Sequence, residues 1–317
     1  MNTDDLIKRV RRSAFIEASS VDWTDDVIIE ELTDMMQQLY ERAVVTADQG
    51  HWMLTEYTTL TPGTRSYRLP ARACAGCVMR FQISSSSSVD WFPLPELSEA
   101  DALRYEYGTE STPQRVTVRG ENAFLLPSQS IGSGYVLRTQ YMIRPSALTA
   151  SQSSTSGAIT AINTTTRALT LQSAFFSAST TGVGSPQTSG TVSIDIVRPG
   201  GWHSVKWTGT ATLTASGLTC TLASNSTGLA EANDLSSISV GDIVRLQNQS
   251  EYPALPADYH RSLADAVAVK ILTLRSLEDK AQALSQSDVV PSLKRFGDML
   301  SPRVGDSAFV LVAPEFV

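Results

Sequence analysis

The sequence has few of the residues that build catalytic or metal centres, and it has no long apolar run. Its 317 residues include three cysteines and three histidines, which is too little for a disulfide framework or an ordinary metal centre. The longest apolar runs, such as residues 309–313, are far shorter than the roughly 20 residues of a membrane-spanning helix. No apolar segment follows the acidic residues 1–5, so we expect no secretory signal. These absences predict a soluble protein of a reduced compartment, away from membranes and without a cofactor.

Positive charge is also scarce. The chain has 25 Lys and Arg residues against 32 Asp and Glu residues, which gives a formal net charge of −7. Proteins that wrap DNA through its phosphates need clustered Lys and Arg, so this class is excluded. By contrast, 42% of the residues are hydrophobic, which is enough for one large core or for two to three ordinary domains.

Charged residues are nearly absent from the middle of the chain. Residues 151–240 contain 34 serines and threonines but only six charged residues, whereas both flanks carry more charge and a helical periodicity. Short alternating apolar segments recur in this block every 8–12 residues or so, with turn signals between them. This alternation is too regular for a disordered linker, the other interpretation of a Ser/Thr-rich block. We therefore predict an inserted all-β module, a small sandwich or barrel, over residues 146–249.

The block before the insert, residues 1–145, is expected to hold two helices and a small sheet. The second helix, over 24–47, is clearly marked. Thr24 is a good N-cap, Asp25 and Asp26 lie in the first turn, and apolar residues recur at steps of three and four. The other predicted elements are helices at 4–16 and 98–105 and strands at 52–58, 65–69, 77–83, 115–119, 123–126 and 135–143.

The block after the insert, residues 250–301, is expected to hold the longest helix. Asp258 can cap a helix that runs to about Leu284, because apolar residues recur at steps of three and four throughout. Such a helix spans about 40 Å and is usual in bundles and ring assemblies. It should pack against helix 24–47, since neither helix can bury its apolar stripe alone. The side chains expected in that core are Ile28, Leu32, Met35, Leu39, Leu263, Val267, Ile271 and Leu274.

The last segment, residues 302–317, is an extended apolar tail. Pro302 and Pro314 prevent one long helix. An apolar, β-prone tail on a soluble protein needs a partner groove or strand, in the same chain or in another. The side chains expected to make that contact are Phe309, Val310, Leu311, Val312 and Phe316.

The fold class predicted from these parts is α+β. A helical bundle core, built from the long N-terminal and C-terminal helices, carries a small sheet and the inserted all-β module.

Motifs that would carry chemistry are weak. Cys74-Ala-Gly-Cys77 has redox spacing, but no helical periodicity follows it, so a structural pair of thiols is the better interpretation. The acidic pairs at 25–26 and 30–31 fit a helix start and a solvated helix face better than an acid–base pair. No nucleophile elbow, phosphate-binding loop or dinucleotide fingerprint is present. We expect neither an enzyme nor a cofactor or metal site.

Aromatic residues of the insert and its exit offer one other site. They could form a surface that stacks on sugars, although aromatic residues on short strands are more often part of a core. These residues are Trp202, Trp207, Tyr252 and Tyr259.

Short stretches of both flanking blocks have a recognisable form. Asp5-Leu6-Ile7-Lys8 opens the first predicted helix, and Trp23-Thr24-Asp25-Asp26 opens the second. Residues 250–260 (Ser-Glu-Tyr-Pro-Ala-Leu-Pro-Ala-Asp-Tyr-His) lead into the long helix through an acidic residue, an aromatic residue, Pro, Leu-Pro and Tyr-His. In these stretches and in the order of its parts, the chain resembles the head-to-tail adaptor (connector) proteins of tailed bacteriophages. The likeness covers about residues 1–145 and 250–300, and the Ser/Thr-rich insert departs from the compact members of that family.

This resemblance implies a non-enzymatic virion protein that is assembled in the host cytoplasm. It would form a ring, commonly of twelve copies, at the head–tail junction. The ring would dock under the portal protein, bind the next tail or neck protein, and leave a channel for genomic DNA without binding it specifically. An acidic chain suits such a channel, because it does not grip phosphates. The tail would then engage the portal or a neighbouring subunit.

Two other classes of protein remain open from the residues alone. A different tail or fibre component, whose β module binds a host glycan or a partner protein, predicts exposed aromatic residues on the insert. A hydrolase that uses carboxylates of the β region predicts paired Asp or Glu residues in a cleft. The insert offers only Asp195, Glu231 and Asp234 for that role.

Overall fold

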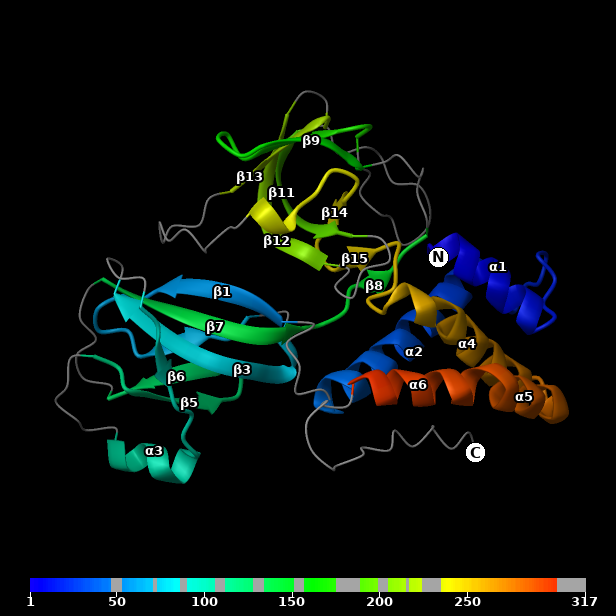
Figure 1. Cartoon of the computed structure of the whole chain (residues 1–317), viewed down its shortest axis with the longest axis horizontal. Coiled ribbons are helices and arrows are strands. Elements are labelled where there is room, and N and C mark those ends of the chain that lie inside the picture. Colours follow the sequence, from blue (N-terminus) through cyan, green and yellow to red (C-terminus); the bar gives the residue numbers. More distant parts are fainter. Residues whose placement is uncertain are drawn as a thin grey trace. The chain divides into compact units, whose positions relative to one another are not determined.

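The computed structural model has a mixed α+β fold, as the sequence predicts, with helices near both ends of the chain and antiparallel sheets between them (Figure 1). Its described residues form two compact units, one from 1–46, 145–223 and 235–300 and the other from 53–144. The structure describes residues 1–46, 53–70, 73–85, 90–105, 112–127, 134–150, 157–174, 189–198, 205–214, 217–223 and 235–300.

The helices begin where side chains satisfy their free N–H groups. The Asn2 side chain accepts a hydrogen bond from the N–H of Asp5 at 2.9 Å, and the Thr24 hydroxyl accepts one from the N–H of Val27 at 3.4 Å. These caps fix the starts of the first two helices. A π-helical turn at Ser285–Val289 joins the last two. The α-helices are α1 (Thr3–Ser13), α2 (Asp25–Thr46), α3 (Glu99–Tyr105), α4 (His260–Leu274), α5 (Glu278–Leu284) and α6 (Val290–Leu300).

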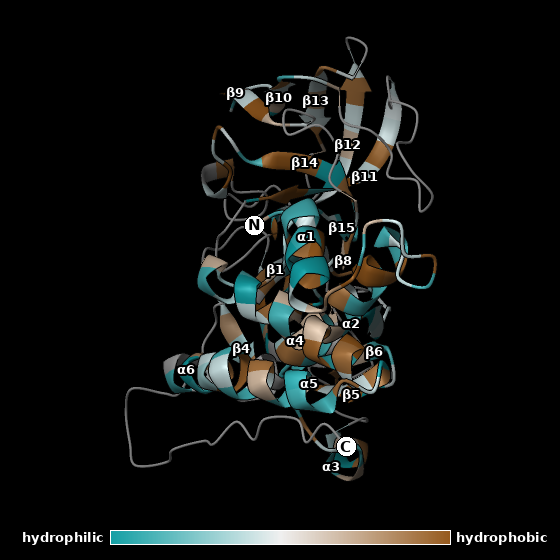
Figure 2. Cartoon of the chain, turned by 90° about the vertical axis from the view of Figure 1, so that its right-hand side faces the viewer, coloured by the Kyte–Doolittle hydropathy of each residue, from teal (hydrophilic) through white to brown (hydrophobic). Residues whose placement is uncertain are grey.

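Helix α4 lies at the centre of the helical part of the first unit. It packs against α1 and α2, as predicted for the helix at 24–47, and against α5. Most of its side chains are buried. In Figure 2, polar colouring dominates α1, whereas α4 carries long hydrophobic stretches. The difference follows from position, because α1 exposes one face to solvent and α4 is covered on several sides.

The predicted continuous helix from Asp258 to Leu284 is wrong. Helix α4 ends at Leu274, Ser276 adopts a left-handed φ of 57°, and α5 starts at Glu278. The N–H of Leu277 donates to the carbonyl of Leu272 at 2.9 Å, which closes the helix end. The apolar periodicity runs through this break, because a helix resumes after only three residues.

The inserted β region is one curved sheet in the order β14-β11-β12-β13-β10-β9. Its two edges meet at one end, where Ala158 bridges to Ile243 and the N–H of Val244 donates to the carbonyl of Gly157 at 2.8 Å. Its interior is a cluster of apolar side chains that includes Leu169, Ile194 and Trp207. The strands are β9 (Ile159–Asn163), β10 (Ala168–Leu171), β11 (Gly190–Val197), β12 (Val205–Thr214), β13 (Thr219–Leu222) and β14 (Ile243–Leu246).

A short parallel pair stands at the root of this sheet. Strand β8 (Ala147–Leu148) leads into the sheet, and β15 (Gln249–Ser250) leads out of it toward α4. Helix α2 contacts β8, where the N–H of Leu148 donates to the Thr33 hydroxyl at 3.1 Å. The entry and exit of the β region are therefore held side by side against the helices.

The second unit is a sandwich of two antiparallel sheets. One sheet has the order β1-β7-β3-β4 and the other β2-β6-β5, and side chains from both build one apolar core. Strand β4 is absent from the sequence predictions, because a proline occupies its centre. The strands are β1 (Met53–Thr59), β2 (Ser66–Arg68), β3 (Ala73–Ser85), β4 (Phe92–Leu94), β5 (Arg115–Arg119), β6 (Asn122–Leu126) and β7 (Tyr135–Ile143).

Candidate interaction surfaces

The helical core contains all but one of the side chains expected there. The expected side chain that the structure leaves exposed is Leu274, with 64% of its surface accessible, so its assignment to the core is wrong. It occupies the last position of α4, beyond the part of the helix that its neighbours cover. The expected residues that are buried are Ile28, Leu32, Met35, Leu39, Leu263, Val267 and Ile271.

An ion pair joins α1 to the buried face of α4. Arg9 donates two hydrogen bonds of 2.9 Å to the carboxylate of Asp265, which is fully buried. The Ser13 hydroxyl donates a third to the same carboxylate at 2.9 Å. The hydrogen bonds to Asp265 raise the pKa of Arg9. A bidentate pair of this kind holds two helices in one relative register.

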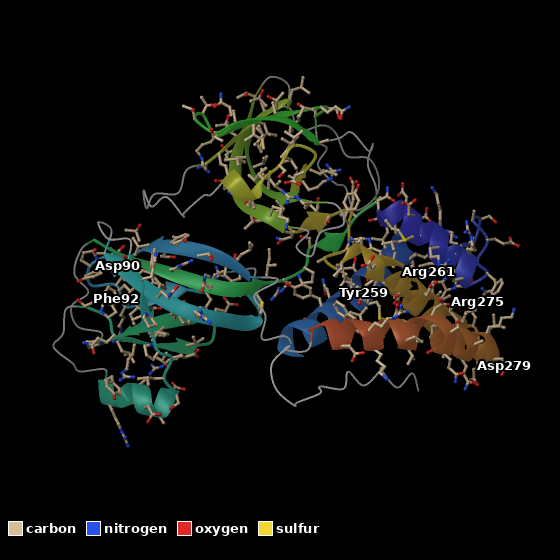
Figure 3. The ribbon with its side chains drawn as sticks, in the orientation of Figure 1. Asp90, Phe92, Tyr259, Arg261, Arg275 and Asp279 are labelled. Atoms are coloured by element: carbon tan, nitrogen blue, oxygen red, sulfur yellow. The ribbon has the colours of Figure 1, made fainter. Side chains whose placement is uncertain are left out.

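The corner between α4 and α5 presents an exposed aromatic side chain. Arg275, labelled in Figure 3, donates hydrogen bonds to the carbonyls of Ala14 and Phe15 at 2.8 and 3.2 Å. Phe15 has a left-handed φ of 53°, which is unfavourable for a bulky residue. Its side chain is 62% exposed, and the Lys280 ammonium lies 4.5 Å from the ring centroid. The corner therefore displays a phenylalanine with a cation over its ring.

A second ion pair lies where the six-stranded sheet meets the helices. Arg245 of β14 pairs with Glu251, and both side chains are almost completely buried. The backbone carbonyl of Glu251 accepts hydrogen bonds from the N–H and the hydroxyl of Thr3, at 2.9 and 3.0 Å. Burial lowers the pKa of Arg245, against the opposing effect of the Glu251 charge. The pair thus connects the last strand of the sheet to the start of α1.

Asp195 forms part of the same junction. This β11 carboxylate is fully buried and accepts hydrogen bonds from the N–H of Asn248 at 2.9 Å and from the Ser146 hydroxyl at 3.4 Å. Both donors flank the parallel pair β8 and β15. A carboxylate that one interpretation assigned to hydrolysis therefore binds the entry and the exit of the sheet together.

The outer face of the four-stranded sheet carries a cluster of aromatic and cationic side chains. The Arg138 guanidinium lies 5.4 Å from the ring centroid of Trp91 and 6.0 Å from that of Tyr57. The two rings are 5.6 Å apart and tilted. Phe92, the first residue of β4, directly follows Trp91 and is 63% exposed (Figure 3). Trp, Tyr and Arg are the side chains that most often dominate protein interfaces.

Two hollows lie at opposite ends of β4. The first, of about 500 Å³, lies toward Pro95, with Val78 in its wall and Arg80 among its lining. The second, of about 470 Å³, lies toward Phe92 and is lined in part by Tyr135. Both are bounded by Pro93 and Leu94.

The cysteine and histidine side chains that the structure describes are buried. Burial lowers the pKa of His260 to about 4 and raises the pKa of the Cys220 thiol to about 12. His260 is therefore neutral near pH 7 and Cys220 is a thiol, so neither is poised for catalysis. The side chains of the pair Cys74 and Cys77, and His51 and His203, lie outside the described residues.

The described residues contain neither a metal-ligand cluster nor a helix of membrane-spanning length and hydropathy. Over the described parts of the chain, no three His, Cys, Asp or Glu side chains are grouped so that they could hold a metal ion. Among the helices described there, none is long and apolar enough to cross a bilayer.

The carboxylates of α2 have separate partners. Asp25 pairs with Arg11 at 2.7 Å, and Glu31 pairs with Lys270 of α4. Asp26 and Glu30 are exposed. These positions agree with a helix start and a solvated face, which is the interpretation favoured from the sequence.

The aromatic residues considered for sugar stacking lie apart. Trp207, the only aromatic residue among the described parts of the six-stranded sheet region, is 8% exposed and lies in the apolar core. The Tyr259 ring packs on Phe296 of α6 with centroids 4.6 Å apart. Trp202 lies outside the described residues. The described part of the sheet therefore shows no aromatic platform.

The predicted contact residues of the tail also lie outside the residues that the structure describes, which end at 300. These residues are Phe309, Val310, Leu311, Val312 and Phe316.

Sequence reasoning missed the surface around β4 and the ion pairs that Arg9 and Arg245 form. The patterns that predict helices and strands do not show which side chains meet, because that depends on how the elements pack, even for residues as near in sequence as Arg245 and Glu251. One signal was present: Asp90-Trp91-Phe92-Pro93 places two large aromatic residues beside a proline, which is unusual for a loop tip.

Comparison with known proteins gives one family. Residues 1–179 match the sequence profile described as SU10 adaptor protein. This stretch includes α1, α2, the sandwich unit and the first hairpin of the six-stranded sheet. No curated protein matches the chain significantly.

Proposed function

The chain belongs to the SU10 adaptor protein family, a phage head–tail adaptor family, and on that premise we propose that it forms a ring at the head–tail junction. The ring docks under the portal protein, binds the next tail or neck protein and leaves a channel for DNA. The observation that carries this proposal is the family match, which covers more than half of the chain. An adaptor role is structural and non-enzymatic.

The exposed features of the subunit support a closed ring. A ring uses heterologous contacts, so each subunit must present two different surfaces. The corner around Phe15 offers an exposed aromatic residue, and the sandwich unit separately offers the cluster around Arg138 and the hollows beside β4. Two unlike surfaces of this kind suit head-to-tail contact between copies. We expect twelve copies, the number common among such connectors.

The net charge suits the channel. A formal charge of −7 disfavours tight binding of phosphates, so DNA slides past the ring without being held. The tail supplies the attachment: Phe309, Val310, Leu311, Val312 and Phe316 bind the portal or a neighbouring subunit. Burial of several such side chains is worth about 1.5–3 kcal/mol each, and the contact is repeated around the ring. The protein is then a component of the virion.

Native mass spectrometry of the full-length chain, alone and mixed with portal protein, tests the proposal. We expect a closed oligomer of about twelve copies that forms a stable complex with the portal. A chain that remains monomeric or trimeric under both conditions contradicts it. Negative-stain images of the mixture add a check, because the ring should lie coaxially under the portal and not at its side.

A further inference from the structure

We propose that the two hollows beside β4 are the receptor for the apolar tail, residues 302–317, of a neighbouring copy of this chain. The inference rests on the proposed ring and says where one subunit holds the next. The observation behind it is an exposed apolar edge on the sandwich unit that matches the tail in spacing and chemistry.

The exposed edge at β4 is apolar and is hollowed on both sides of Pro93. Strand β4 is the outermost strand of its sheet, and Phe92 and Pro93 on it are exposed. The hollow toward Pro95 measures about 500 Å³ and the hollow toward Phe92 about 470 Å³. Both volumes fall in the range of sites that enclose a ligand. Trp91 precedes Phe92, and Arg138 lies opposite Gln82 of the first hollow, so an aromatic and a cationic side chain stand beside them.

The proline in β4 limits the backbone hydrogen bonds that a partner strand can form along this edge. Pro93 has no N–H, so a strand added along this edge loses a ladder hydrogen bond at its centre. Backbone pairing alone therefore cannot bind an extended peptide here. Side chains inserted on either side of Pro93 must supply most of the affinity, which requires a partner with two apolar clusters.

The tail has two such clusters. Residues 309–312 are Phe-Val-Leu-Val, and Phe316 follows after Ala-Pro-Glu. In an extended chain, four to five residues span about 15 Å, and the five residues 92–96, which line the two hollows between them, span about the same length. The first cluster fits one hollow and Phe316 the other, with Pro314 between them, where no N–H is needed. Glu315 can approach Arg80, whose side chain is exposed at the rim.

The reach of the tail favours a neighbour as the receptor. The described chain ends at residue 300, and an extended segment from there to Phe316 spans about 50 Å. That length exceeds the width of a small domain, so the tail can leave its own subunit. An arm that each copy gives to the next also supplies the head-to-tail contact of a ring.

Photo-crosslinking in the full-length protein tests the inference. Phe316 is replaced by p-benzoylphenylalanine, and ¹⁴N-labelled and ¹⁵N-labelled protein are mixed before assembly and irradiated. We expect crosslinks to residues 78–96, with peptides of mixed isotope content, because donor and receptor belong to different copies. The same photo-reactive group at Val240, an exposed residue before β14, serves as the control and should not reach residues 78–96.

A matched pair of substitutions measures the contribution of the hollows. Phe92→Asp should lower the crosslink yield at least fivefold, whereas Leu103→Asp, on the equally exposed side chain of α3, should change it less than twofold. Both positions are solvent-exposed, so circular dichroism should show folded protein for both variants.

The outcomes separate this inference from the proposed function. A ring that forms while Phe316 crosslinks to its own chain, to the helices or only to the portal overturns the receptor assignment and leaves the adaptor role standing. A chain that stays monomeric with and without portal, and gives no mixed-isotope crosslink, overturns both.

Discussion

The helices of the first unit share an apolar core and are also joined by ion pairs between residues far apart in the sequence, whereas the six-stranded sheet is joined chiefly by its apolar interior. Arg9 reaches Asp265 and Lys270 reaches Glu31, across more than 230 residues in each case. The core cluster of the sheet consists of apolar residues only. The sheet's own bidentate pair, Arg198 with Asp242, joins residues only 44 apart, and Arg245 and Asp195 lie where the sheet meets the helices.

This difference follows from the order of the chain. Strands β9 and β10, and β12 and β13, are hairpin neighbours, so short loops bring them into register at small entropic cost. Helices α1 and α4 meet only after the whole insert has been made. Apolar contacts between helices tolerate sliding, but a bidentate arginine–carboxylate pair is satisfied in one register. The ion pairs therefore specify which helix faces meet.

The largest effect is expected at the junction between the two parts. Arg245→Met should lower the free energy of unfolding by about 3–5 kcal/mol, because the Glu251 carboxylate stays buried without its cationic partner. Urea denaturation followed by circular dichroism measures the change. The double variant Arg245→Met/Glu251→Leu should recover much of the loss. If the single variant is as stable as the parent protein, the junction is not held by charge.

The second-largest effect is expected in the pH dependence of the free energy of unfolding, which His260 of α4 should dominate between pH 4 and 6.5. His260 is buried, with a pKa near 4 in the folded chain against about 6.5 unfolded. Between these values the unfolded chain binds the extra proton, so stability is full above pH 6.5 and falls as the pH drops toward 4. The expected loss is at most about 3 kcal/mol. His260→Gln should flatten this part of the profile, and the difference between the two curves removes the contribution of other groups. Parallel curves would contradict the buried neutral histidine.

Breaking the pair between α1 and α4 should cost somewhat less. Arg9→Met leaves Asp265 buried, but Ser13 still donates to that carboxylate, and Arg261 lies 3.6 Å from it. We expect destabilisation of about 2–3 kcal/mol, measured by denaturant titration. Arg12→Met, on the exposed side of the same helix, is the matched control and should change stability by less than about 0.5 kcal/mol. Equal effects at both positions would mean that helix propensity, not pairing, is being measured.

The smallest effect is expected at the end of α4. Leu274→Ala should change stability by less than about 0.5 kcal/mol, because the side chain is 64% exposed. Ile271, one turn earlier, is fully buried, and Ile271→Ala should cost about 2–5 kcal/mol. Thermal melting of the two variants side by side decides where the buried part of the helix ends. A large loss at Leu274 would restore the longer helix predicted from the sequence.

Local patterns were enough to predict most elements, but not the places where distant residues meet. The Thr24 cap and the alternation at 135–143 gave α2 and β7 with nearly correct ends. The break at Ser276 was not predicted, because the apolar periodicity continues across it. The contact of Arg275 with the end of α1 was not predicted either, since its partners lie more than 250 residues away. Strand β4 was not predicted because proline is rare inside strands. The hollows were not predicted because a cavity depends on how side chains pack, which the sequence does not show. The family resemblance, by contrast, was predictable from short stretches at helix starts.

The parallel pair of β8 and β15 has a consequence for engineering. Neighbouring strands are about 4.8 Å apart, so the chain enters the six-stranded sheet region after Leu148 and leaves it before Gln249 at almost the same point. A graft at this position needs only a guest domain whose own termini are adjacent, because β8 stays against α2 and β15 still leads to α4. Such a guest must also neutralise Glu251, whose partner Arg245 would leave with the native sheet. The same geometry lets a lineage gain or lose the whole module in one step, by exchanging about 100 residues for a tight loop.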